Sequence, residues 1–133
     1  MDPADILSVP EREEIVSTLR SATDEGRAVW YLMPADRESD TFGLDMGTHK
    51  YVLYPKDDDG VAPFNLDIFQ EDGTRLALIF STPRDRQNYS PTVNASLRYI
   101  YETLYRKFNR PEESVSKLMS EIHELESGNE PPF

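Results

Sequence analysis

A β-hairpin pattern in the middle of the chain constrains the fold more than any other part of the sequence. Two apolar runs, Phe64–Phe69 and Thr74–Phe80, flank a polar turn that contains Asp72-Gly73. Asp-Gly between runs of alternating apolar and polar residues is typical of a hairpin. The sequence therefore predicts two adjacent antiparallel strands.

The register of this hairpin depends on the length of its loop. A two-residue turn at Asp72-Gly73 would leave both faces of the sheet mixed. A three-residue loop with Gly73 in the left-handed conformation gathers six large apolar groups on one face, so we expect this loop. The expected pairs are Ile68 with Leu76, Leu66 with Leu78, and Phe64 with Phe80.

Capping signals and apolar periodicity predict three helices. A capping box, Ser8-Val9-Pro10-Glu11, opens the first helix, and Glu25-Gly26 ends it. Ser90-Pro91 opens the longest helix, which runs to Asn109. Glu112-Glu113 begins a third helix that ends at Ser127-Gly128.

The remaining apolar runs predict strands. We expect a strand covered on both faces within Ala28–Met33, and a strand pair, Thr41–Met46 with Thr48–Tyr54, around Gly47. The expected fold class is α+β: an N-terminal helix, a four- or five-stranded, mostly antiparallel sheet, and a C-terminal antiparallel helix pair packed on one sheet face. We expect residues 1–128 to form a single domain and residues 129–133 to form a flexible tail.

Composition and missing motifs exclude several classes of function. The chain has no cysteine, which removes disulfides, thiol catalysis and thiolate metal sites. No glycine-rich phosphate loop or nucleophile turn is present. The acidic run at 56–60 lacks calcium-loop spacing, and His49 and His123 lie in different predicted elements. We therefore expect a protein without catalytic activity, cofactor or metal. No apolar run could span a membrane, and an acidic N-terminus does not fit a secretion signal, so we expect a protein that is not secreted.

The charge of the chain indicates the kind of solvent in which the protein works. There are 25 acidic against 14 basic residues, a formal net charge of -11, and only four of the basic residues are lysines. At molar salt the Debye length falls to about 3 Å and the self-repulsion of such a surface nearly vanishes. This composition is similar to that of proteins from salt-accumulating cells or their viruses. The alternative is an acidic protein kept soluble by its charge.

One segment carries a net charge of the opposite sign. Residues 83–110 carry a net charge of +4, whereas the rest of the chain carries -15. Tyrosines are interleaved with the arginines, a composition favoured in protein interfaces and in single-strand binding grooves. An ordinary ion-pair ladder through Arg98, Glu102 and Arg106 is the alternative. We expect nucleic acid to be disfavoured by the surrounding acidity. The expected partner-binding residues are Arg84, Arg86, Tyr89 and Arg110.

These observations favour a non-enzymatic interaction or assembly protein that self-associates as a homo-oligomer or docks onto a protein partner. Its size, acidity and order of elements are similar to those of viral connectors, tail-completion proteins and acidic secretion chaperones, by analogy of architecture alone. A cytoplasmic or virion location fits this hypothesis. The alternative function is an acidic regulator that mimics DNA and inhibits a nucleic-acid-processing system.

Overall fold

The structure is a computed structural model that describes residues 2–126. The expected α+β class is confirmed, and the sheet has five strands. The elements in chain order are a short 3-10 helix η1 (Pro3–Asp5), α1 (Val9–Asp24), β1 (Tyr31–Met33), β2 (Thr41–Met46), β3 (His49–Pro55), β4 (Phe64–Phe69), β5 (Arg75–Phe80), α2 (Pro91–Asn109) and α3 (Glu112–Glu126). The predicted tail, residues 129–133, and the predicted helix end at Ser127-Gly128 lie outside the described residues.

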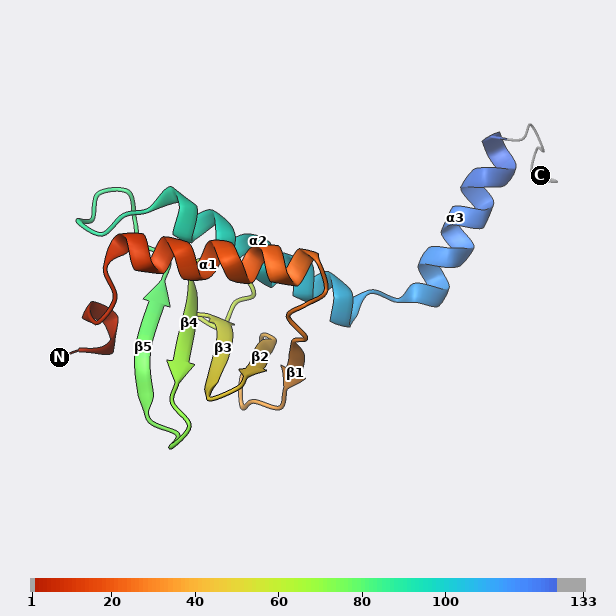
Figure 1. The fold of residues 1–133 in the computed structure, drawn as a ribbon. Coiled ribbons are helices and arrows are strands. Elements are labelled where there is room, and N and C mark those ends of the chain that lie inside the picture. The colour runs from red at the N-terminus through yellow and green to blue at the C-terminus, as the bar shows by residue number, and fades with distance from the viewer. Residues whose placement is uncertain (1, 127–133) are drawn as a thin grey trace.

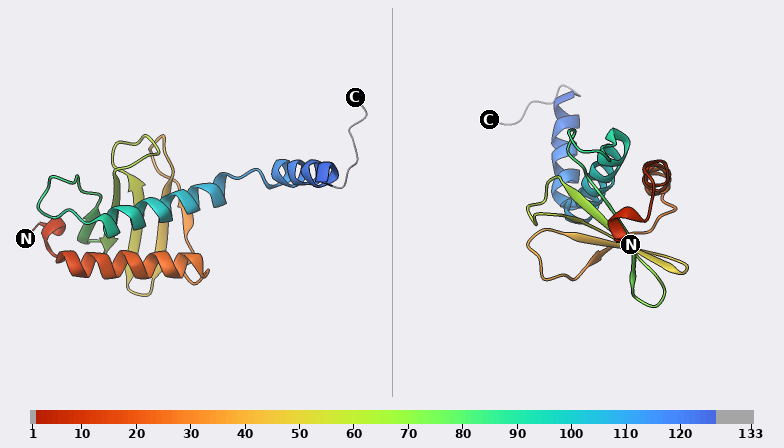
Figure 2. Two further views of the ribbon diagram at one scale, coloured as in Figure 1. Left: turned by 90° about the horizontal axis from the view of Figure 1, so that it is seen from above. Right: turned by 90° about the vertical axis from the view of Figure 1, so that its left-hand side faces the viewer.

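The five strands form one antiparallel meander in the order β1-β2-β3-β4-β5. Helices α1 and α2 lie side by side across one face of this sheet, and α3 projects beyond it (Figure 1). The view from above shows that α3 leaves in the general direction of α2 (Figure 2). The body of the protein is therefore a two-layer sandwich with a projecting helix.

The predicted helix starts are confirmed by their caps. The Ser8 hydroxyl accepts from the Glu11 amide at 3.2 Å, and the Glu11 carboxylate accepts from the Ser8 amide at 2.9 Å. At the start of α2, the Ser90 hydroxyl accepts from the Val93 amide at 3.1 Å. These bonds satisfy amides that have no partner within the helix.

The core lies between the helix pair and the sheet, and aromatic rings occupy its centre. The ring of Tyr101 from α2 stacks on Phe64 with centroids 4.7 Å apart, and meets Phe42 edge-on at 5.3 Å. Its hydroxyl donates to the carbonyl of Asp40 at 3.0 Å, which ties the connection before β2 to α2. Tyr101 therefore belongs to the core, as the apolar stripe of this helix predicts.

The predicted register of the β4–β5 hairpin is wrong, and none of the three expected pairs is present. Gly73 has a φ of +88°, and the Gln70 amide donates to the Thr74 carbonyl at 2.8 Å, so the three-residue loop is present. Phe69 pairs with Arg75, but the register then shifts past Leu76. Because of this β-bulge, Ile68 pairs with Ala77 and Leu66 with Ile79, while Leu78 and Phe80 lie on the face opposite the helices.

The first strand is shorter and more exposed than expected. Only Tyr31–Met33 pairs with β2, at the edge of the sheet, and Leu32 is exposed. Trp30 before it is buried, and its indole N–H donates to the Thr23 hydroxyl at 2.9 Å. The apolar run at 28–33 therefore serves partly to anchor the end of α1 and not to form a central strand.

The helix that packs beside α2 is α1, whereas the sequence predicted an antiparallel pair of α2 and α3. No residue of α3 is buried. The short connection between α2 and α3 permits a helical hairpin, but the backbone there is extended and the two helices diverge. The consequence is an amphipathic helix whose apolar side faces no other described element.

Candidate protein-interaction surface

The apolar stripe of α3 is the largest exposed apolar array on a single element. Leu118, Met119, Ile122 and Leu125 recur at helical spacing and are 53%, 46%, 41% and 56% exposed. Val115 continues the stripe toward the start of the helix and is half-buried. A stripe of this width is what a helix buries against a core or a partner. We name these five residues the α3 stripe.

The junction between α2 and α3 explains why α3 does not fold back onto α2. Pro111 disfavours the helical conformation of the residue before it, and Arg110 has an extended ψ of 121°. The Arg110 guanidinium then pairs with the Glu112 carboxylate at 3.2 Å. This pair spans the two helices across the break. The amide of Val115 donates to the Pro111 carbonyl at 3.0 Å, so α3 starts at once.

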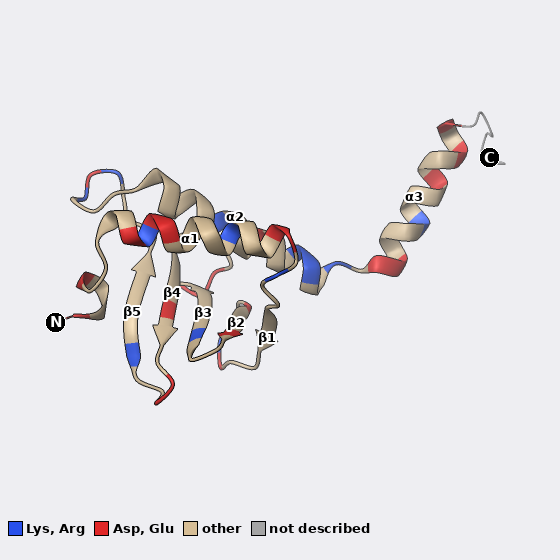
Figure 3. Ribbon diagram, viewed as in Figure 1, with Lys and Arg blue, Asp and Glu red and all other residues tan. Residues whose placement is uncertain are grey.

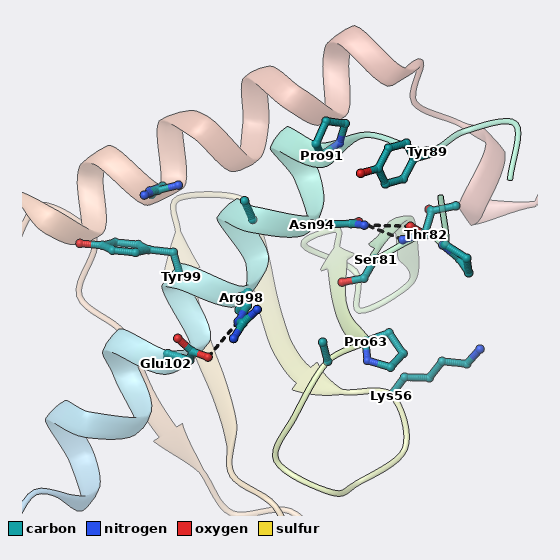
Figure 4. Close-up of a pocket in the computed structure, with 14 residues that line it drawn as sticks. Lys56, Pro63, Ser81, Thr82, Tyr89, Pro91, Asn94, Arg98, Tyr99 and Glu102 are labelled. Carbon is teal, nitrogen blue, oxygen red and sulfur yellow. Dashed lines mark hydrogen bonds and ion pairs between the residues drawn. The ribbon is translucent and has the colours of Figure 1, made fainter. Parts of the chain in front are cut away.

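A second candidate surface is an open groove of about 770 Å³ beside α2, shown in Figure 4. Four parts of the chain contribute to it: α1, the β3–β4 connection, the segment after β5, and the exposed flank of α2. We call it the α2 groove. The lining residues are Arg20, Lys56, Ala62, Pro63, Ser81, Thr82, Pro83, Tyr89, Pro91, Asn94, Ala95, Arg98, Tyr99 and Glu102.

Asn94 fixes the segment after β5 against α2. Its side-chain carbonyl accepts from the Thr82 amide at 2.9 Å, and its side-chain amide donates to the Thr82 carbonyl at 2.8 Å. Figure 4 shows this pair of bonds at the end of the groove that is nearest Tyr89. A side-chain amide that satisfies both backbone groups of one residue holds it in a single position. This end of the groove is therefore preformed.

Asp58 holds the β3–β4 connection, which forms the opposite wall. Its carboxylate accepts from the amides of Glu38 and Ser39 at 2.9 and 2.8 Å and from the Ser39 hydroxyl at 2.5 Å. The Ser39 hydroxyl and these amides lower the pKa of Asp58 to about 2. Arg37 adds an ion pair at 3.5 Å and donates to the Pro55 carbonyl.

The charges in the groove are mainly positive. The guanidinium carbon of Arg20 lies 4.1 Å from the ring centroid of Tyr99, whose hydroxyl donates to Asp24 at 2.6 Å. This bond to a carboxylate raises the pKa of Tyr99. Arg98 pairs with Glu102 at 3.0 Å, but both side chains are largely exposed, and such pairs contribute about 0.3–0.5 kcal/mol. Lys56 supplies a third cation from the facing wall.

The structure separates the four predicted partner-binding residues. Arg84 and Arg86 are exposed in the connection before α2, and Tyr89 lines the α2 groove. Arg110 lies at the other end of the 19-residue α2, about 28 Å away along the helix. Figure 3 shows acidic residues spread over α1, the loops and α3, with basic residues in the connection before α2, within α2 and at its C-terminal end.

Sequence reasoning missed Arg20 and Lys56 as groove residues because both lie outside the basic segment 83–110. Only the fold brings them beside Arg98. The α3 stripe was visible as an apolar periodicity, but we assigned it to packing against α2. One signal could have corrected that assignment: Pro111 directly follows the end of α2, and the residue before a proline favours extended backbone.

Within residues 2–126, His, Asp and Glu side chains form no group of three or more that could hold a metal ion. Each helix in that range is too short or too polar to cross a lipid bilayer. The chain matches no protein-family model, no curated protein and no solved structure.

Proposed function

We propose that this protein is a non-enzymatic assembly protein that associates with further copies of itself through α3. The observation that carries the proposal is the α3 stripe, with four large apolar side chains exposed on a helix that projects from the body. An isolated helix of about 15 residues is only marginally stable in water, and most helices are stabilised by burying an apolar face. In this chain a second molecule would provide the burial.

The acidic surface supports the same proposal. A net charge of -11 keeps copies apart at low ionic strength, and it suits a cytoplasm or a virion at high salt, where screening lets apolar surfaces meet. We propose that the protein works in such a setting, as a viral structural protein or a chaperone-like adaptor would. Arg84, Arg86 and Tyr89 would contact carboxylates of the associating copy, and Arg110 would fix the direction in which α3 leaves.

The test compares the full chain with a chain that ends at Arg110. We expect sedimentation equilibrium at micromolar to millimolar concentration to show association of the full chain, and a monomer for the shortened chain. Because no residue of α3 is buried, the shortened chain should keep its fold, which the fluorescence of the buried Trp30 reports. A full chain that stays monomeric at every concentration and salt level would overturn the proposal, as would equal association of the two chains.

A further inference from the structure

The α3 helix and the α2 groove have complementary chemistry. On α3, five glutamates and one lysine give a net charge of -4 beside the apolar stripe. The α2 groove presents three cations and one carboxylate, and prolines, alanines and tyrosine rings make up most of the remaining lining. An acidic amphipathic helix is the class of ligand that an apolar groove with a basic rim would bind.

We propose that α3 of one copy docks in the α2 groove of a second copy, and that the two copies exchange these helices reciprocally. The inference rests on the proposed function, because it names the docking site of the helix that mediates association. The α3 stripe would face Ala62, Pro63 and Ala95, while the α3 glutamates would approach Arg20, Lys56 and Arg98.

The direction of α3 allows this exchange. It leaves the body at the C-terminal end of α2, whereas the groove follows α2 from Pro91 to Glu102, nearer its N-terminal end. Two copies related by a two-fold axis, with their α2 helices antiparallel, would therefore place each α3 beside the α2 groove of the other copy. The 15 residues of α3 span about 22 Å, and the groove segment of α2 about 17 Å, so the lengths match.

The area of the contact favours a reciprocal arrangement. A helix about 22 Å long and 10 Å wide has a lateral surface of roughly 700 Å². Covering a third to a half of it, with an equal area of groove, buries roughly 500–700 Å². Stable interfaces bury about 1,200–2,000 Å², so a single contact would be too small. Two reciprocal contacts bury roughly 1,000–1,400 Å², which reaches that range.

Engineered cysteines test this docking site directly, because the chain has no native cysteine. A copy with Met119→Cys on α3 is mixed with a copy with Ala95→Cys, an exposed groove position, under mild oxidation. We expect a mixed disulfide between the two copies. Thr48→Cys is the matched control, since Thr48 is exposed and lies outside the groove.

Three other outcomes would overturn the inference. Predominant Met119→Cys homodimers would indicate that two α3 helices pair with each other. A link to Thr48→Cys instead of Ala95→Cys would place α3 near the β2–β3 turn. A disulfide in the monomeric double variant Met119→Cys/Ala95→Cys, without mixed dimers from the single variants, would show that α3 folds back on its own body.

Charge reversal in the groove provides a second, independent test of the docking site. Lys56→Glu with Arg98→Glu places two acidic groups in the groove, and we expect the dissociation constant of the dimer to rise at least tenfold at 0.1 M salt. The control, Lys50→Glu with Arg27→Glu, makes the same change of net charge outside the groove, and Arg27, like Arg98, pairs with a neighbouring glutamate. Equal effects of the two pairs would refute the groove assignment while leaving α3-mediated association intact. A chain that never associates refutes the proposed function itself.

Discussion

Replacing Leu118 and Ile122 with glutamate should strongly weaken association without unfolding the body. Full burial of a leucine or isoleucine side chain stabilises by about 1.5–3 kcal/mol. These two side chains are 53% and 41% exposed in the single copy, so a partner can bury about half of each, for about 1 kcal/mol per side chain. Two side chains in each of two copies give about 4 kcal/mol. Since about 1.4 kcal/mol is a tenfold change, the dissociation constant should rise roughly 10³-fold.

Sedimentation equilibrium of the variant and the parent chain measures this change, and circular dichroism reports whether α3 stays helical. The matched control is Ser116→Glu with Ser120→Glu, which adds the same charge to exposed positions of α3 outside the stripe. We expect the control to change the dissociation constant by less than tenfold. The reasoning fails if the stripe variant associates within fivefold of the parent chain, or if the control weakens association as much.

Three further predictions concern the body and its solvent. The Asp58 carboxyl should titrate at about 2 in the folded chain, and Ser39→Ala should raise its pKa toward the ordinary value of 3.8, because the hydroxyl bond is the largest cause of the shift. A lowered folded-state pKa means that the contribution of Asp58 to stability is present above the unfolded pKa and is lost as pH falls through about 2. Carbon-13 NMR titration measures the midpoint, and a midpoint near 4 in the parent chain would contradict the assigned bonds. Gly73→Val should lower the free energy of unfolding by about 1 kcal/mol or more, because Gly73 has a φ of +88° and a β-branched residue is strained there. Urea unfolding followed by Trp30 fluorescence checks this, and an unchanged midpoint would count against the turn. The melting temperature should rise markedly when KCl is raised from about 0.1 M to molar levels, where screening removes most of the repulsion. A melting temperature that calorimetry finds unchanged across this range of KCl would remove the inference of a salt-accumulating source.

The elements predicted most successfully from the sequence are those encoded by neighbouring residues. The capping box at Ser8, the N-cap at Ser90 and the left-handed Gly73 depend on interactions over two or three positions, and all three are present. The hairpin register was not predictable in this way. It depends on one extra residue, Leu76, whose position is set by packing of the small Ala77 and of Ile79 against the core.

The two candidate surfaces also differ in how far neighbouring residues encode them. The apolar periodicity of α3 is a local signal, but whether it faces α2 or a second molecule depends on the backbone at Arg110, for which Pro111 is the only sequence cue. The α2 groove has no local signal at all. Arg20, Lys56 and Arg98 are separated by at least 36 positions in the chain, and only the packing of α1 and the β3–β4 connection around α2 brings them together.

The opposite charges of α3 and the segment before it have a role that the apolar stripe cannot fill. Two copies with a net charge of -11 repel each other at a distance, so at low salt they approach most easily when an acidic α3 meets a basic groove. Complementary charge thus selects the orientation of encounter. It cannot supply most of the affinity at molar salt, because a Debye length of about 3 Å limits attraction to pairs in contact. In the proposed assembly the α3 stripe would provide that affinity, and this separation of roles would account for a short helix that carries both five glutamates and an apolar face.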